Sequence, residues 1–176
     1  MEEVKDVILD KSRLVKYLAG KHWLEKNKEI SPVMLHKGLF ILYTQWVIYH
    51  SMGENQEAEM SVIPHSLGGR LFEPAFHAWA YGPADKGIHT TFKWYLANKM
   101  TKSECYEFEE GLHETVKDFL DNIVLRLFDT GVYSLIGLTQ QSDTWREVAS
   151  SHKESSTGEM SEEAIVKEYK NKRELI

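Results

Sequence analysis

The sequence predicts a mostly α-helical domain with a small β-hairpin, an α+β fold packed around one buried central helix. Apolar residues recur at helical spacing in most segments of the 176-residue chain. The run from Val33 to Tyr49 is apolar on nearly all sides, which is typical of a fully buried helix. A short stretch, "AFHAWAY", alternates with the two-residue period of a strand. Hydrophobic residues make up 42% of the chain, which favours a packed core over a disordered polymer.

The first third of the chain predicts two helices. The opening 30 residues are expected to be helical, and Gly20 is expected to end or kink that helix. Ser31 is a good N-cap and Pro32 suits the first helical position, so the central helix is expected to begin there. The polar residues Gly53 to Glu59 are expected to form a loop.

The middle of the chain predicts a turn and a hairpin. The segment "SLGGRLF" indicates a turn that leads into a short strand. In "AFHAWAY" the side chains of Phe76, Ala78 and Ala80 face one way, and those of His77, Trp79 and Tyr81 face the other. We expect Gly82-Pro83 to stop this hairpin.

The remainder predicts further helices. A helix is expected from Asp85 to Lys99, and a long amphipathic helix from about Ser103 to Asp129. Shorter helices are expected in "YSLIGLTQQ" and "SDTWREVA". We assign residues 1–150 to one domain with its N-terminal helix. Residues 151–176 are expected to form a polar linker and a C-terminal helix that begins at Ser161 and docks on the same domain.

Composition and charge exclude several classes of protein. The formal net charge of −6 argues against a dedicated nucleic-acid binder. No apolar run approaches the ~20 residues of a membrane helix, and the start of the chain lacks the features of a signal peptide. The single cysteine, Cys105, suits a reducing compartment, so we expect a cytoplasmic protein.

One segment departs from the acidic average, because Lys11 to Lys28 carries six basic residues against one acidic residue. The simplest interpretation is the solvated face of a helix. The alternative is a basic patch for an acidic partner, and Lys16, Lys21 and Lys26 are then the candidate partner surface.

No catalytic, cofactor or metal signature is found, and we expect a protein that is not an enzyme. Gly68-Gly69 lacks the Gly-Lys-Ser/Thr that ends a phosphate loop, and no Gly-x-Ser-x-Gly elbow occurs. Cys105 lies among acidic residues, which disfavour a reactive thiolate. No two of the eight histidines have the spacing of a helical ligand pair. A metal site could form only across the fold, from His65, His77 and His89, and we expect no metal.

Aromatic residues gather around the Gly-Pro dipeptide. Trp79 and Tyr81 precede it, and such residues occur both in cores and at binding surfaces. The sequence leaves both roles open for Trp79.

Three blocks of the chain resemble the Panacea domain family, also called the SocA-like or GepA-like domain. The first is "SPVMLHKGLFILY", similar to Ser/Thr-Pro-apolar-x-Leu-Gln-Lys-Leu-Leu-Tyr. The second is "LFEPAFHAWAYGPA", which contains the specific Ala-Trp-x-Tyr-Gly-Pro pattern, and the third is "LTQQSDTW". His36 replaces the usual Gln of the first block, and Gln140 replaces the usual His of the third, so a proton-transfer role at position 140 is lost.

The resemblance implies a bacterial or prophage antitoxin that neutralises a toxin by direct binding. A phage-encoded interaction protein or protease adaptor that acts on a host factor is the alternative, and a small hydrolase that uses the histidines is a weaker one. The resemblance also implies that a cluster of motif residues packs near the central helix, where it forms either a pocket or part of the scaffold. The cluster consists of Lys37, Trp79, Tyr81, Gly82, Pro83 and Trp145. The expected partner is a protein, with no membrane and no nucleic acid, and the sequence leaves open whether the chain forms a homo-oligomer.

Overall fold

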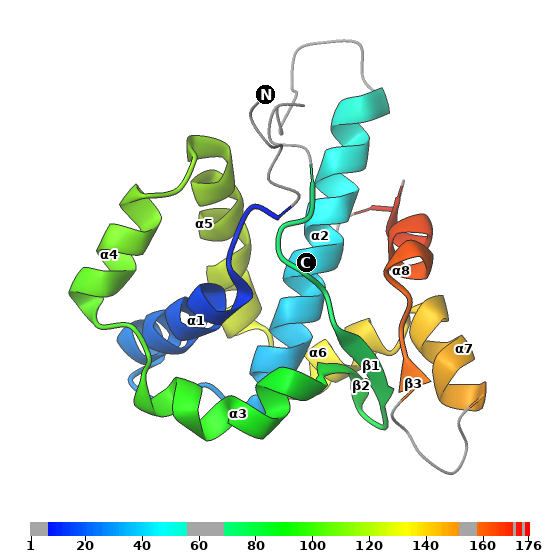
Figure 1. Ribbon diagram of the computed structural model, residues 1–176, viewed down its shortest axis with the longest axis horizontal. Helices are drawn as coiled ribbons and strands as arrows, with labels where there is room; N and C mark the ends of the chain where they lie inside the picture. The colour runs from blue at the N-terminus through cyan, green and yellow to red at the C-terminus, as the bar shows by residue number, and fades with distance from the viewer. Residues whose placement is uncertain (1–6, 56–68, 152–157, 171, 174) are drawn as a thin grey trace.

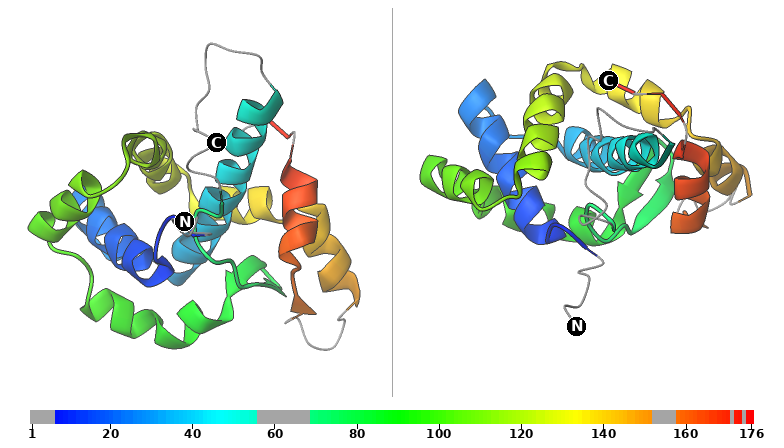
Figure 2. Two further views of the ribbon diagram at one scale, coloured as in Figure 1. Left: turned by 45° about the horizontal axis from the view of Figure 1, so that its top comes forward. Right: turned by 90° about the horizontal axis from the view of Figure 1, so that it is seen from above.

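The computed structural model describes residues 7–55, 69–151, 158–170, 172–173 and 175–176. A long helix, α2 (Pro32–Asn55), runs through the middle of the molecule (Figure 1). The other helices are α1 (Lys11–Lys26), α3 (Lys86–Ala97), α4 (Lys102–Glu110), α5 (Glu114–Asp129), α6 (Val132–Thr139), α7 (Asp143–Ser151) and α8 (Glu162–Tyr169). Helices α1, α4 and α5 lie on one side of α2, and a small sheet lies with α7 and α8 on the other (Figures 1 and 2). The predicted fold class, mostly α with a small β element around a buried central helix, is confirmed.

The sequence of α2 explains its central place. Ser31 Oγ accepts a hydrogen bond from the Met34 N–H at 3.1 Å, and Pro32 occupies the first helical position without losing a bond. Leu35, Leu39 and Phe40 have essentially no exposed surface, and apolar residues surround the helix on nearly every side. The helix continues to Asn55, so the predicted loop was wrong for its first three residues. Residues 56–59 lie outside the described part of the chain.

The sheet has three antiparallel strands in the order β2-β1-β3: β1 (Phe76–Trp79), β2 (Gly82–Asp85) and β3 (Gly158–Glu159). The expectation that Gly82-Pro83 would stop the hairpin was wrong, because these two residues open its second strand. Gly82 has a φ of 103°, which only glycine adopts readily, and this lets the chain reverse over Ala80 and Tyr81. Residues 66–68 of "SLGGRLF" lie outside the described ranges, and Arg70 forms an isolated parallel bridge with Val7 instead of belonging to a longer strand.

Two predictions about helix ends were wrong. Gly20 does not end α1; it lies inside the helix, where a Cβ atom would stand 2.2 Å from the Met100 carbonyl oxygen. Its missing side chain lets the segment after α3 approach α1, and Met100 N–H donates to the Lys16 carbonyl at 3.1 Å. The long helix predicted from Ser103 to Asp129 is divided into α4 and α5. Gly111 caps the first of them, and His113 caps the second by accepting from the Thr115 N–H.

The C-terminal helix α8 packs against α2 and α7. Ser161 is its N-cap, as predicted, and Ile165 and Tyr169 are buried. The predicted linker begins in α7 and ends in β3, and the residues between them lie outside the described ranges. Among the helices of the described ranges, none combines the length and the apolar character needed to cross a bilayer.

Candidate functional site

A pocket of about 390 Å³ opens between the start of α2, the hairpin and α3, and we call it the hairpin pocket. Its walls are mostly apolar or aromatic, and three basic side chains are set among them. It is lined by Pro32, Val33, His36, Lys37, Trp79, Ala80, Tyr81, Ala84 and His89. A volume in this range suits a small ligand or a single side chain.

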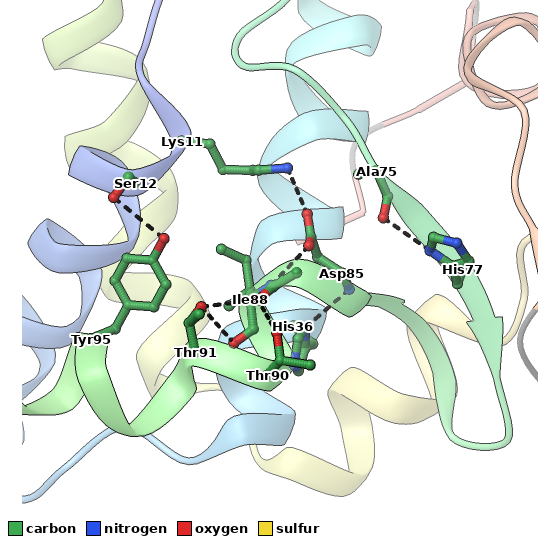
Figure 3. Close-up of polar contacts among 11 residues, drawn as sticks. Lys11, Ser12, His36, Ala75, His77, Asp85, Ile88, Thr90, Thr91 and Tyr95 are labelled. Carbon is green, nitrogen blue, oxygen red and sulfur yellow. Dashed lines mark hydrogen bonds and ion pairs between the residues drawn. The ribbon is translucent and has the colours of Figure 1, made fainter.

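Two adjacent residues of α2 hold the outer edge of β2. The Lys37 Nζ donates to the Pro83 carbonyl at 2.9 Å, and the Asp85 N–H donates to His36 Nδ1 at 3.1 Å. Figure 3 shows the second contact, together with Lys11, whose Nζ lies 2.7 Å from an Asp85 carboxylate oxygen. Since β2 pairs with β1 on one side only, these side chains satisfy backbone groups that would otherwise be buried without partners.

Burial controls the protonation of both residues. Burial, with a smaller contribution from the neighbouring Lys37 cation, lowers the pKa of His36 from 6.5 to about 4. His36 is therefore neutral at pH 7, and because Nδ1 accepts a hydrogen bond, the proton lies on Nε2. Burial also lowers the pKa of Lys37 to about 8, and within the described residues no carboxylate forms an ion pair with it.

Two polar atoms of the pocket residues are buried without a hydrogen-bond partner in the described structure. They are His36 Nε2 and Trp79 Nε1. The Trp79 ring packs edge-on against His89, with 4.6 Å between the ring centroids, and lies 6.1 Å from the His36 ring. Buried donors without partners carry an uncompensated desolvation cost.

The structure brings most of the motif cluster together. Lys37, Trp79 and Tyr81 line the pocket, and Pro83 is bonded to Lys37. Trp79 is half-buried, whereas the Tyr81 side chain is 69% exposed. Trp145 lies outside the pocket lining: its indole N–H donates to the Trp79 carbonyl at 2.9 Å and fastens α7 to the hairpin.

Two further contacts hold the hairpin turn. Gly82 lies so close to its neighbours that a Cβ atom would stand 2.8 Å from Thr139 Oγ1 and 3.3 Å from Lys37 Cε. The Gln140 amide donates to the Ala80 carbonyl at 3.2 Å. The residue that replaces the histidine of the resembled motif thus makes a structural hydrogen bond.

Sequence reasoning did not assign His36 or His89 to this site. His36 was noted only as a departure from a motif, and His89 only as a distant metal candidate. The available signal was the adjacency of His36 to Lys37, but nothing local shows that both side chains turn toward β2. No set of three potential metal-ligating side chains lies together in the described ranges, and His65 is outside them.

The basic residues of α1 are occupied within the chain. Lys21 Nζ lies 2.8 Å from a Glu109 carboxylate oxygen. Lys26 forms an ion pair with Asp129. Lys16 lies over the Trp94 ring, 6.0 Å from its centroid. Lys21 and Lys26 thus link α1 to α4 and α5.

Cys105 is buried between α4 and α1, and burial raises the pKa of its thiol to about 11. The thiol is therefore protonated at pH 7, as its acidic surroundings predicted.

Comparison of the chain with family models, with curated proteins and with solved structures finds no match.

Proposed function

We propose that the chain is a non-enzymatic binding protein, an antitoxin that neutralises a toxin by direct contact. The observation that carries the proposal is the hairpin pocket, because Trp79, Ala80 and Tyr81, which belong to the most specific block of the resemblance, form one of its walls. An exposed aromatic residue beside a half-buried one is the arrangement that protein partners use as an anchor.

The polar groups around the pocket favour binding over catalysis. Lys37 and His36 are bonded to the backbone of β2. Asp85 pairs with Lys11 and caps α3 by accepting from the Ile88 N–H at 3.0 Å. These groups hold the hairpin in place, which is what a rigid binding surface requires.

Tyr81 is the first residue to test as a partner contact. It projects from the hairpin turn with 69% of its surface exposed, and removing its ring leaves the core intact. Tyr133, on α6, is 89% exposed and provides a matched control for the loss of a surface tyrosine.

The experiment is co-expression with the reading frames that flank the gene. We expect one of them to arrest growth alone and to be neutralised by this chain, with a complex of the two proteins on size-exclusion chromatography. Tyr81→Ala should weaken rescue, and Tyr133→Ala should not. If no flanking frame is toxic, or if rescue occurs without a complex, the antitoxin proposal is wrong.

A further inference from the structure

The hairpin pocket suits an apolar group. Its walls present mainly carbon atoms, from the rings of Trp79 and Tyr81 and from the small apolar side chains beside them. The Nε2 atom of His36 and the Nε1 atom of Trp79 have almost no accessible surface, so they do not open into the pocket. The volume of about 390 Å³ accommodates one large side chain, and a side chain in a pocket is the usual anchor of a protein interface.

Two exposed lysines lie on the helix that forms one edge of the pocket. Lys86 and Lys93 of α3 come three residues before and four residues after His89, which lines the pocket. This spacing places the three side chains on one side of the helix, which we call the basic face of α3. In contrast to Lys21 and Lys26 of α1, neither lysine forms an ion pair with a carboxylate in the described part of the chain.

Few carboxylates lie near the pocket to balance these lysines. Within α2, the hairpin and α3, the acidic residues are Glu54 and Asp85. Glu54 is next to the last residue of α2, roughly 30 Å along the helix axis from the pocket, and Asp85 is paired with Lys11. Glu29, which precedes α2, is paired with Lys99. The surroundings of the pocket are therefore basic in a chain whose net charge is −6.

The spacing of the lysines favours a peptide over a small acid. Seven residues of helix span about 10 Å, which is more than the width of one carboxylate. An extended peptide rises about 3.3 Å per residue, so it presents several carboxylates over this length. A nucleic-acid strand also carries spaced anions, but two lysines neutralise few of its phosphates and the acidic chain repels it.

We propose that the hairpin pocket and the basic face of α3 together bind an acidic segment of a partner protein. One large apolar or aromatic side chain of the segment enters the pocket beside Trp79 and Tyr81. Acidic residues within about three positions of it pair with Lys86 and Lys93. This inference rests on the proposed role of the pocket as a protein contact, and it does not require that the partner be a toxin.

The test is the selection of random peptides of about 12 residues, displayed on phage, against the immobilised full chain. We expect the enriched peptides to be net acidic, with acidic residues close to one aromatic or large aliphatic residue. Synthetic copies should bind the chain saturably in fluorescence anisotropy. Their affinity should fall at least about threefold between roughly 0.05 and 0.5 M salt, because salt screens charges at the rim of an interface.

A matched pair of double variants tests the basic face of α3. Lys86→Gln with Lys93→Gln should weaken peptide binding at least about fivefold and should reduce its dependence on salt. Lys102→Gln with Lys167→Gln removes the same charge from exposed positions on α4 and α8, and it should bind as the parent does.

A second pair of variants tests the pocket. Tyr81→Ala removes part of its wall and should weaken binding at least about fivefold, whereas Tyr133→Ala on α6 should not. The proposal is overturned if no peptide is enriched, if the enriched peptides are not acidic, or if the folded Tyr81→Ala or lysine double variant of α3 retains full affinity. Tighter binding of a single-stranded DNA of similar length would also overturn it.

These outcomes separate the acidic segment from the antitoxin proposal. If acidic peptides bind as expected and no flanking frame is toxic, the antitoxin proposal is wrong and the acidic segment stands. If a flanking toxin is neutralised by direct contact and the selection yields no acidic peptide, the antitoxin proposal stands and the acidic segment is wrong.

Discussion

Replacing His36 by glutamine should make folding less sensitive to acid. His36 is buried, with 4% of its surface exposed, and its Nδ1 accepts the Asp85 N–H at 3.1 Å. A protonated ring would lose this acceptor and would place a second cation beside Lys37. The glutamine amide oxygen can accept the same hydrogen bond and does not titrate in this range.

The size of the effect follows from the pKa of His36. Burial lowers it from 6.5 to about 4 in the folded chain, so between these values the unfolded chain binds a proton that the folded chain does not. Stability is therefore retained above pH 6.5 and is lost as the pH falls toward 4. Between pH 7.5 and 4.5 the His36 contribution to the free energy of unfolding should fall by roughly 2 to 3 kcal/mol.

Urea unfolding followed by tryptophan fluorescence at both pH values measures this quantity. The parent should lose roughly 2 to 3 kcal/mol more than His36→Gln between the two values, because all other groups titrate alike in both proteins. His77→Gln, at a half-buried position in β1, is the matched control and should lose as much as the parent. Equal losses in the parent and in His36→Gln would refute the assigned hydrogen bond and the neutral state of the ring.

Two other substitutions test contacts of the fold. Gly20→Ala should lower the free energy of unfolding by about 2 kcal/mol or more, since its Cβ would meet the Met100 carbonyl at 2.2 Å. The control is Gly137→Ala in α6, where the added Cβ meets open space, and it should raise the free energy of unfolding by up to about 1 kcal/mol. Equal effects of the two substitutions in urea unfolding would contradict the close approach at Gly20. Glu168→Gln should destabilise the fold by about 2 kcal/mol at pH 7, because the carboxylate accepts hydrogen bonds at the start of α7 and from Lys172. These contacts lower the pKa of Glu168 to about 2 despite burial. The difference in stability between the parent and Glu168→Gln should therefore disappear as the pH falls from 4.5 toward 2. A difference that persists near pH 2 in acid unfolding would argue against an ionised Glu168.

The parts of the fold that the sequence predicts well are those determined by neighbouring residues. The start of α2 depends on Ser31 and Pro32, and the start of α8 depends on Ser161; each cap bonds a backbone N–H three residues along the chain. The burial of α2 follows from apolar residues on all its sides. In each case the signal lies within a few residues of the element that it predicts.

The parts that could not be predicted depend on distant contacts. Gly20 has the sequence signature of a helix end, and only the approach of Met100, eighty residues along the chain, explains a glycine inside α1. Strand β3 has two residues and no periodicity of its own, so its pairing with β1 has no local signal. The apolar stripe of α4 and α5 is continuous in sequence. It therefore predicts one long helix and gives no signal of the break at Gly111 and His113.

The same division explains the candidate site. Its aromatic wall was predicted from one short motif, but the roles of His36 and Lys37 depend on bonds to residues 46 to 49 positions away. The order of His36 and Lys37 along α2 matches the backbone groups that β2 presents at its outer edge. Pro83 has no N–H, so at the outer edge of β2 it presents only a carbonyl, which requires a donor such as Lys37. Asp85 presents an N–H, which requires an acceptor such as His36. The motif that the chain resembles has Gln-Lys where this chain has His36-Lys37, an acceptor followed by a donor in both. Lys37 is therefore buried because the Pro83 carbonyl at the strand edge needs a donor, and no carboxylate among the described residues pairs with its ammonium group.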